Sequence, residues 1–324
     1  MPELIDWRGA RLRATRDLTP DIRLFEIEPS GGFVAPTPGS HINIAVQIGE
    51  RPDTRSYSVV GLCRDGLYRI AVKLLGNSRG GSAYMWRLRP GARLDISGPG
   101  NHFELSRDRP DYLLVAGGIG ITPIYTMALA LAEAGARFRL LYACRRRQDL
   151  AFADELRERI GDRLELFVSE EGRRIDLGAE IAHLAPDGEL YVCGPIPMLD
   201  AAKRHWQESG RPVDRLRFET FGNSGRFAPE PFKVLIPRLG REIEVPRNQT
   251  MLEALEAAGI EMIYDCRRGE CGLCALKILA TDGIVDHRDV FFSDEEKAEN
   301  AKLLTCVSRV AGGSITVDTP DRFA

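Results

Sequence analysis

The N-terminal part of the chain alternates between apolar and polar positions in short stretches. DIRLFEIEP, SHINIAVQI and LYRIAVKLL carry this pattern, and turns that contain Gly, Pro or Asp separate them. No long stretch of helical periodicity interrupts the region from Ile5 to about Arg107. Because successive side chains of a strand point to opposite faces of a sheet, the pattern predicts an antiparallel sheet or barrel.

From about Asp111 to Gly222, apolar strands alternate with helices instead. YLLVA, FRLLYA, LELFV and ELYVCG are typical of strands, whereas IYTMALALAEAG, DLAFADELRERIG and PMLDAAKRHWQESG are typical of helices. This alternation predicts parallel strands joined by crossover helices, and therefore a doubly wound α/β sheet. The ligands of such sheets bind beyond the carboxyl ends of the strands.

One stretch in this region, from Tyr112 to Ala132, lacks charged residues and is long enough to cross a bilayer. GGIGITP interrupts it. We therefore expect a buried strand, a turn and a helix here, and no membrane segment.

A third pattern follows NSGRFAPEP, which has the composition of a linker. FKVLIPRLGREIEVP predicts a β-hairpin, MLEALEAAGI predicts a helix capped by Thr250, and SITVDTP predicts a closing strand. We expect a multi-domain α+β protein with domains at residues 1–108, 109–224 and 232–324.

Composition narrows the possible functions. The 324 residues carry a net charge of −3, which does not favour binding to nucleic acid. The beginning, MPELIDWRGARLRATRDLTP, lacks the apolar run of a secretion signal, so a cytoplasmic location is expected. The chain has seven cysteines, and this odd number argues against a disulfide framework and favours a metal site.

Three cysteines lie close together in YDCRRGECGLC. Cys266, Cys271 and Cys274 have the spacing CxxxxCxxC, and Cys306 follows 32 positions after the last of them. This is the spacing of a plant-type [2Fe-2S] site, which needs four thiolates. The alternatives are a zinc site, for which the five histidines supply no paired ligands, and simple packing of the thiols.

The cysteine loop, together with DHRDVFFSDEEK and LLTCVSRV, resembles the C-terminal ferredoxin domain of the phthalate dioxygenase reductase family. The resemblance extends over the whole chain. It implies an N-terminal antiparallel β-barrel that binds flavin, a central nucleotide domain and a C-terminal β-grasp ferredoxin domain. Members of this family are reductase components of two-component Rieske oxygenases.

TRSYS resembles the RxYS flavin motif of the ferredoxin reductase superfamily. Arg55 suits a phosphate, Tyr57 offers an aromatic face to a flat ring, and Ser58 suits the polar edge of that ring. Ser56 lies between them. Taken alone, the stretch is a weak signal, because it also fits a half-exposed strand.

NSRGGS supports the flavin interpretation, because adjacent glycines followed by a hydroxyl can surround phosphate oxygens. A simple turn before a short helix would have the same sequence. In the family this segment binds the FMN phosphate, so the resemblance implies FMN rather than FAD. The contacts it implies are Gly80, Gly81 and Ser82 on the phosphate and Val72 and Lys73 at the ring edge.

GGIGITP lies between a strand and a helix, as a nucleotide loop must, although a proline replaces the last glycine of GxGxxG. CGP ends another strand at what should be the same edge. Either could be an ordinary strand-to-helix turn. The resemblance implies that both loops flank the pyridine nucleotide, with the cysteine near the nicotinamide. The contacts that it implies are Gly118, Gly120, Thr122, Pro123, Cys193, Gly194 and Pro195.

YACRRRQDLAF resembles the family's segment near the adenosine ribose, with Arg145 on the matching arginine. The family favours NADH, but Arg146 and Arg147 add charge that could accept the 2′-phosphate of NADPH, unless they are only a solvated run. The resemblance also implies that Phe221 covers the flavin ring, although a core position at a strand end is an equal alternative.

Together these motifs imply a relay. Nicotinamide gives up two electrons as hydride and a [2Fe-2S] cluster accepts one at a time, so a flavin between them is expected. The implied partner is a Rieske-type terminal oxygenase, and the family suggests a monomer. Two alternatives stay open: a reductase for another acceptor such as a haem protein, and an electron carrier without nicotinamide activity.

Overall fold

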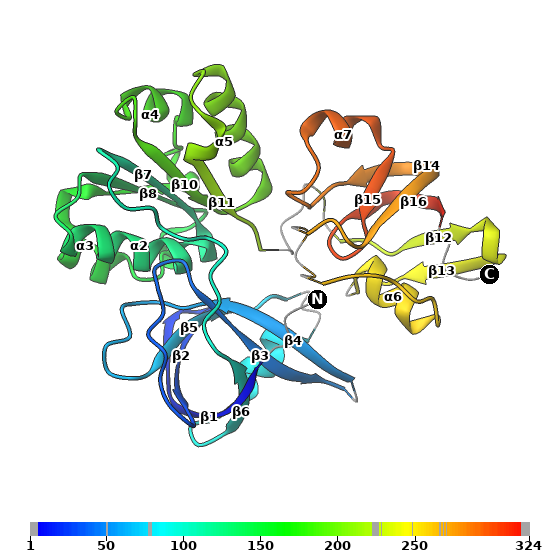
Figure 1. Cartoon of the computed structure of the whole chain (residues 1–324), viewed down its shortest axis with the longest axis horizontal. Helices are drawn as coiled ribbons and strands as arrows, with labels where there is room; N and C mark the ends of the chain where they lie inside the picture. The colour runs from blue at the N-terminus through cyan, green and yellow to red at the C-terminus, as the bar shows by residue number, and fades with distance from the viewer. Residues whose placement is uncertain are drawn as a thin grey trace. The chain divides into compact units, whose positions relative to one another are not determined.

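The computed structural model describes residues 6–49, 51–76, 80–221, 227, 229–247, 249–265, 267, 269 and 271–318, which form three sheets (Figure 1). The chain divides into two compact units, one ending at Glu219 and the other beginning at Thr220. The first unit contains an antiparallel and a parallel sheet, and the second a mixed sheet. The predicted multi-domain α+β class is confirmed, and the domain limits 1–108, 109–224 and 232–324 stay a proposal.

The N-terminal sheet has six strands in the order β4-β3-β6-β1-β2-β5. A bridge between Val59 and Ile70 joins its two ends, so the strands close into a barrel. As the alternation predicts, Ile42, Ile44 and Val46 of β3 lie in its buried core. The elements are β1 (Trp7–Thr19), β2 (Ile22–Pro29), β3 (His41–Ile48), β4 (Arg51–Ser58), β5 (Tyr68–Lys73), α1 (Gly81–Arg87) and β6 (Arg93–Ser97).

The central sheet is parallel, with the strand order β11-β10-β7-β8-β9. Two helices, α2 and α3, lie on one face and two, α4 and α5, on the other (Figure 1). No helix in the described part of the chain is long and apolar enough to cross a membrane. The elements are β7 (Tyr112–Gly117), α2 (Ile121–Glu133), β8 (Phe138–Cys144), α3 (Ala153–Ile160), β9 (Leu164–Val168), α4 (Leu177–His183), β10 (Glu189–Cys193), α5 (Ile196–Glu208) and β11 (Leu216–Glu219).

The helix predicted for DLAFADELRERIG begins later than its sequence suggests. Phe152, at its N-cap, has a left-handed backbone with φ 63°, which a continuous helix cannot contain. A separate 3-10 turn over Arg147–Asp149 precedes it. The chain after β8 therefore turns sharply at the edge where ligands of such sheets bind.

The second unit has the strand order β13-β12-β16-β14-β15, and β12 and β16 pair in parallel, as in a β-grasp. Thr250 caps α6 as predicted, forming a capping box with Glu253. β14, β15 and α7 were not predicted, because the middle of β14 is exposed on both faces and shows no alternation. The elements are β12 (Phe232–Ile236), β13 (Arg241–Val245), α6 (Met251–Ala257), β14 (Ala275–Asp286), α7 (Asp294–Glu299), β15 (Lys302–Leu304) and β16 (Arg309–Asp318).

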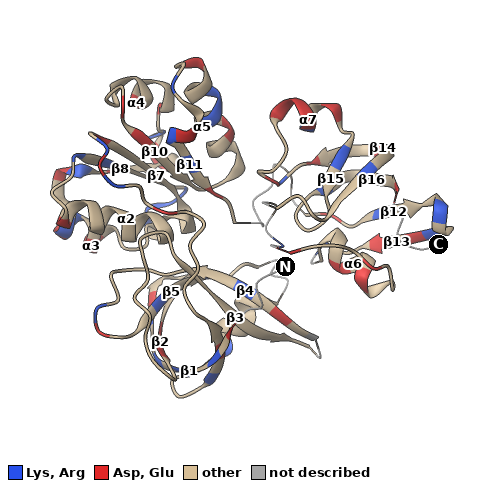
Figure 2. Ribbon diagram, in the orientation of Figure 1, with Lys and Arg blue, Asp and Glu red and all other residues tan. Residues whose placement is uncertain are grey.

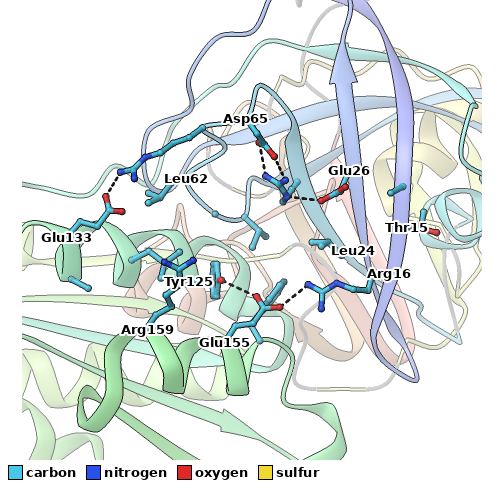
Figure 3. Close-up of a pocket in the computed structure, with 18 residues that line it drawn as sticks. Thr15, Arg16, Leu24, Glu26, Leu62, Asp65, Tyr125, Glu133, Glu155 and Arg159 are labelled. Atoms are coloured by element: carbon cyan, nitrogen blue, oxygen red, sulfur yellow. Dashed lines mark hydrogen bonds and ion pairs between the residues drawn. The ribbon is translucent and has the colours of Figure 1, made fainter.

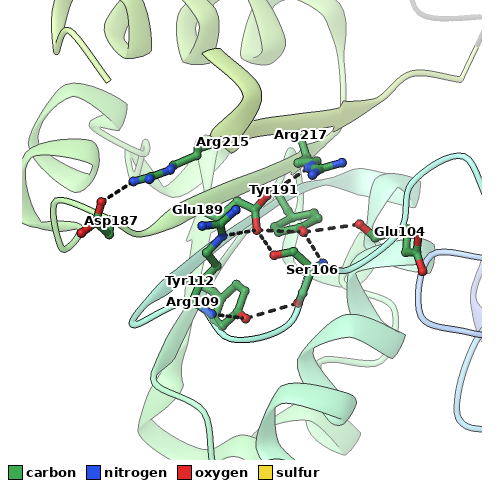
Figure 4. Close-up of polar contacts among 9 residues, drawn as sticks. All are labelled: Glu104, Ser106, Arg109, Tyr112, Asp187, Glu189, Tyr191, Arg215 and Arg217. Atoms are coloured by element: carbon green, nitrogen blue, oxygen red, sulfur yellow. Dashed lines mark hydrogen bonds and ion pairs between the residues drawn. The ribbon is translucent and has the colours of Figure 1, made fainter. Parts of the chain in front are cut away.

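A buried polar network fixes the chain that connects the barrel to the parallel sheet (Figure 4). Glu189, at the start of β10, has no exposed surface, and its carboxylate accepts a hydrogen bond from Arg217 Nε at 2.9 Å. Ser106 in the connection donates to the same carboxylate, and its backbone N–H donates to Tyr191 Oη at 2.7 Å. The network ties the connection to two strands of the sheet.

A cleft of about 750 Å³ separates the barrel from α2 and α3 (Figure 3). Ion pairs cross it between Arg16 and Glu155, at 2.8 Å, and between Arg64 and Glu133. These pairs are exposed, so each contributes only about 0–1 kcal/mol. Buried Thr126 adds a stronger link, because its hydroxyl accepts the N–H of Gly61 at 2.9 Å. Barrel and parallel sheet are therefore held as one unit.

Candidate functional site

The strand β4 presents the TRSYS motif beside the start of α1. Arg55 and Tyr57 alternate with Ser56 and Ser58 along the strand, so the two pairs face opposite sides of the sheet. A Cβ on Gly81 would lie 2.5 Å from Nε of Arg55, so the glycine backbone packs directly on the guanidinium group. The fold thus brings the two predicted flavin motifs together.

One nitrogen of Arg55 has no hydrogen-bond partner among the described residues. Nη1 contacts Asp53 Oδ2 at 2.6 Å and donates to Thr54 O at 2.8 Å. Nη2 is buried and has no hydrogen-bond partner among the described residues. Since buried polar atoms are normally bonded, and since a guanidinium group pairs well with phosphate, this nitrogen fits an FMN phosphate oxygen. Gly80 beside it has φ 101°, a conformation that favours glycine.

Tyr57 offers the expected aromatic surface. Its ring is half-buried and packs against the barrel core. Burial raises the pKa of its phenol well above the ordinary value, and the charge of Arg55 offsets part of that rise. Tyr57 is therefore neutral at physiological pH, as a surface for a flat ring requires. On the other face, Ser58 is buried and the hydroxyl of Ser56 donates to Asn43 Oδ1 at 2.5 Å.

The other predicted flavin contacts have partners inside the protein. The side chain of Val72 lies in the barrel core, and its carbonyl accepts a hydrogen bond from Trp86 Nε1 at 3.1 Å. Lys73 Nζ lies 3.3 Å from Asp21 Oδ2. The hydroxyl of Ser82 accepts the N–H of Leu75 at 3.4 Å. A contact of Val72 with a ring edge would therefore involve its backbone rather than its side chain.

The nucleotide motifs meet at the point where the strand order reverses. β8 and β9 lie on one side of β7, whereas β10 and β11 lie on the other. The crevice of a doubly wound sheet opens at this switch point, beyond the carboxyl ends of β7 and β10. GGIGITP begins at the last residue of β7 and CGP begins at the last residue of β10, with Ala116 opposite Cys193 in the register. The sheet thus places both loops at its ligand-binding edge.

Glycines let these two loops touch. A Cβ on Gly120 would lie 2.6 Å from the carbonyl carbon of Cys193, and a Cβ on Gly194 would lie 3.1 Å from Cα of Gly117. A Cβ on Gly117 would lie 2.5 Å from Cδ of Pro195. Gly118 differs, because its φ is 55° and nothing lies within 4 Å of the Cβ position, so it borders open space. The sequence prediction missed Gly117, although the doubled glycine was its signal.

Two side chains at this edge are engaged by the protein itself. Thr122 is buried, and its hydroxyl donates to Ile119 O at 3.0 Å, so it stabilises the turn. Cys193 has no exposed surface, and burial, followed by the nearby charge of Glu219, raises the pKa of its thiol well above the ordinary value. Cys193 therefore remains an uncharged thiol. Glu219 stands opposite it in β11.

The three consecutive arginines that directly follow β8 are each paired with a carboxylate. Arg145 is 81% exposed and lies 3.2 Å from Glu170. Arg146 contacts Asp149 at 2.8 Å, and Arg147 contacts Glu171 at 2.6 Å. The positive charge that could have received a 2′-phosphate is thus balanced locally, which favours NADH over NADPH.

The described cysteines of the metal loop lie in an apolar shell. Cys274 and Cys306 are buried with Leu252, Phe292 and Val307, whereas Cys271 is partly exposed. A hydrogen bond from Cys306 lowers the pKa of Cys274 to about 6, although burial opposes the shift. The two thiols are therefore neighbours. Cys266 lies outside the described residues, and no group of three metal ligands is complete among the residues that are described.

The backbone of the loop fits a wrapped cluster. Gly269 and Gly272 have φ values of 81° and 78°. A Cβ on Gly269 would lie 2.7 Å from Cγ2 of Val307, and one on Gly272 would lie 2.5 Å from Cε2 of Phe291. Thr305, which the sequence prediction missed, joins the ligand segments, because its hydroxyl donates to the carbonyl of Cys274 at 3.0 Å. Sulfur donors on a loop bent by glycines fit a [2Fe-2S] cluster.

Phe221 follows β11 by two residues, is half-buried and belongs to the second unit. Its predicted place on the flavin ring stays a prediction.

Two parts of the chain match known domain families. Residues 235–311 match the 2Fe-2S iron-sulfur cluster binding domain, and residues 114–204 match the oxidoreductase NAD-binding domain. The chain is 39% identical over 310 residues to tetrachlorobenzoquinone reductase from Sphingobium chlorophenolicum, covering 92% of this chain and 94% of the relative. It is 37% identical over 324 residues to the heme-dependent oxidative N-demethylase beta subunit from Ectopseudomonas mendocina (strain ymp), covering 98% and 100%.

Solved structures agree with these matches. An intact type IV self-sufficient cytochrome P450 monooxygenase shares 33% identity with a TM-score of 0.66; the match covers 96% of this chain but spans only 41% of that longer one. Phthalate dioxygenase reductase, a modular structure for electron transfer from pyridine nucleotides to [2Fe-2S], shares 30% identity with a TM-score of 0.72, and the match covers 97% and 98% of the two chains. The chain therefore belongs to the phthalate dioxygenase reductase family.

Proposed function

We propose that this oxidoreductase takes electrons from NADH, passes them through FMN to its [2Fe-2S] cluster, and delivers them to a Rieske-type terminal oxygenase. The observation that carries the proposal is the combination of three sites in one chain: the Arg55 pocket for a flavin phosphate, the glycine-lined edge at the switch point, and the cysteine loop. When bound, flavin connects two-electron and one-electron chemistry, which no side chain can do.

In this function, the residues of the chain bind and orient the cofactors and do not exchange protons with them. Gly117, Gly120 and Gly194 bring two backbone loops into contact at the nucleotide edge. The thiol of Cys193 is buried and uncharged behind these loops, so it adds no charge to a site for a nicotinamide ring. Positioning of this kind accounts for much of the rate of a transfer between bound groups. No acid–base pair is required.

The charge of the second unit supports a protein partner. Residues 232–324 contain 12 basic and 16 acidic side chains, a net charge of −4. The exposed helix α7 holds four of the acidic residues (Figure 2), and the half-exposed ring of Phe291 lies close by in sequence. These acidic side chains favour association with a basic surface on an oxygenase.

We also propose that the protein is a monomer and that it is located in the cytoplasm.

A haem protein is the second candidate acceptor. Two of the matches reported above name one: the heme-dependent oxidative N-demethylase beta subunit, which this chain matches over its full length, and the self-sufficient cytochrome P450. The same relay within this chain would serve either acceptor, because both accept single electrons.

Absorbance of the purified protein tests the relay. We expect flavin bands together with broader cluster absorption, and bleaching of both on addition of NADH. Cys271→Ser should leave flavin reduction intact and abolish electron export, whereas Cys63→Ser, a buried cysteine outside the loop, should leave both intact. Turnover with a Rieske oxygenase, compared with turnover with a cytochrome P450, distinguishes the two acceptors. A protein that lacks flavin and contains zinc instead of iron would refute the proposal.

A further inference from the structure

Two arginines of the second unit are buried although neither belongs to the cysteine loop. Arg288 is 4% exposed and Arg309 is 6% exposed. Burial of a guanidinium group is costly unless its donors are bonded. Arg288 contacts the carboxylate of buried Asp286 at 2.7 Å, and Arg309 stacks over the ring of Phe232 at 5.1 Å.

Both arginines also bind the chain that enters the second unit. Nη2 of Arg288 donates to Phe227 O at 3.0 Å. Nη2 of Arg309 donates to Glu230 O at 2.9 Å and to Pro246 O at 3.0 Å. Phe227 and Glu230 precede β12, the first strand of this unit. Two guanidinium groups therefore hold backbone carbonyls before the ferredoxin fold begins.

The same arginines lie in segments that carry an iron ligand or contact the cysteine loop. Arg309 is the third residue after Cys306, and Arg288 directly precedes Asp289. The Cα of Asp289 would lie 3.0 Å from a Cβ on Gly269 in the cysteine loop, and the next residue donates its N–H to Gly269 O at 3.0 Å.

Ser308, in the segment of Arg309, binds the segment that contains Arg288 and Asp289. Its hydroxyl donates to Asp289 Oδ1 at 3.4 Å and accepts the N–H of Arg288 at 3.4 Å. The entering chain is thus joined to the cysteine loop through buried groups.

We infer that Arg288 and Arg309 are positioning residues for electron transfer from flavin to cluster, because they clamp the entering chain to the part of the ferredoxin domain that carries the iron ligands. This inference rests on the proposed function. Loss of the clamp would let the segments that carry the iron ligands shift against the chain that enters the unit, and misplacement of an electron donor or acceptor slows transfer between them.

Arg309→Met and Arg288→Lys test the clamp. Arg309→Met removes the donors and keeps an apolar chain over Phe232, and Arg288→Lys keeps the charge beside Asp286. After rapid mixing with NADH, flavin reduction should be unchanged and the rate constant of cluster reduction should fall at least about twofold, because the cluster segments are less well positioned. Iron content, the electron paramagnetic resonance signal and the midpoint potential of the cluster should stay as in the parent protein. Arg309→Lys should restore part of the rate.

Arg211 offers a matched control in the first unit. Its guanidinium group also donates to backbone carbonyls, of Ala185 at 2.7 Å and Ile181 at 3.2 Å, and stacks over Trp206. Arg211→Met should lower thermal stability and leave cluster reduction unchanged. If Arg309→Met and Arg288→Lys with full cluster content reduce the cluster at the parental rate, the clamp has no positioning role. If the parent cluster is not reduced by NADH at all, the proposed function fails instead.

Discussion

The backbone of Gly120 packs against the carbonyl of Cys193, so close that a Cβ would lie 2.6 Å from the carbonyl carbon. The neighbour is backbone at the end of a central strand and cannot move aside. Gly120→Ala should displace the CGP loop, destabilise the first unit by roughly 1–3 kcal/mol, and slow flavin reduction by NADH at least about tenfold. Stopped-flow absorbance measures the rate.

Gly98→Ala is the control, because nothing lies within 4 Å of its Cβ position. Equal effects of the two substitutions would mean that contact between the loops does not control the nicotinamide site.

Arg55 should decide which flavin is bound. Its buried Nη2 has no partner among the described residues, so a phosphate would be its acceptor. Arg55→Gln should weaken FMN binding by about 2–3 kcal/mol, since a charge-assisted hydrogen bond is lost, and leave riboflavin binding nearly unchanged. Fluorescence titration of the apoprotein with both flavins measures the difference. A parallel loss of affinity for FMN and riboflavin would place the phosphate elsewhere.

The sequence predicted those features of the site that are local. The strand, turn and helix of GGIGITP follow from apolar runs and glycines, and the spacing of Cys266, Cys271, Cys274 and Cys306 indicates its chemistry without a structure.

The contacts between segments could not be predicted. The packing of Gly81 on Arg55 and of Gly117 on Pro195 arises where distant segments meet, and no periodicity records it. β14 escaped prediction for another reason, because its exposed middle has no buried face to impose an alternation.

Local charge balance should set the nucleotide preference. Glu170 and Glu171 neutralise Arg145 and Arg147 at distances of 3.2 and 2.6 Å. Glu170→Gln combined with Glu171→Gln should raise kcat/KM for NADPH about three- to tenfold, because the released guanidinium groups can accept a 2′-phosphate. The value for NADH should change little, and steady-state assays with both nucleotides measure the ratio.

Glu165→Gln provides the comparison, since it removes an exposed carboxylate of β9 that lies 3.0 Å from Arg173. A similar gain with NADPH in this variant would show that overall charge, not the arginines after β8, governs the preference.

Glu189 should matter for stability and not for the rate of electron transfer. Its buried carboxylate lies 2.9 Å from Arg217 and 3.8 Å from Arg109, so Glu189→Gln leaves two guanidinium groups without their counter-charge. Because Arg217 and Arg109 are themselves 43% and 32% exposed, water compensates part of this loss, which costs about 1–3 kcal/mol. The temperature at which the first unit releases FMN should therefore fall by about 5–8 °C.

Glu180→Gln is the matched comparison, because Glu180 pairs with Arg139 nearer the surface and the shift should be only a few degrees. Glu189 begins β10 and Cys193 ends it, so the carboxylate lies at the opposite edge of the sheet from the nucleotide loops. At a temperature where the Glu189→Gln variant is folded, flavin reduction should proceed at the parental rate. A slower reaction in folded, flavin-loaded protein would instead mean that the network at the base of the strand controls the geometry at its far end.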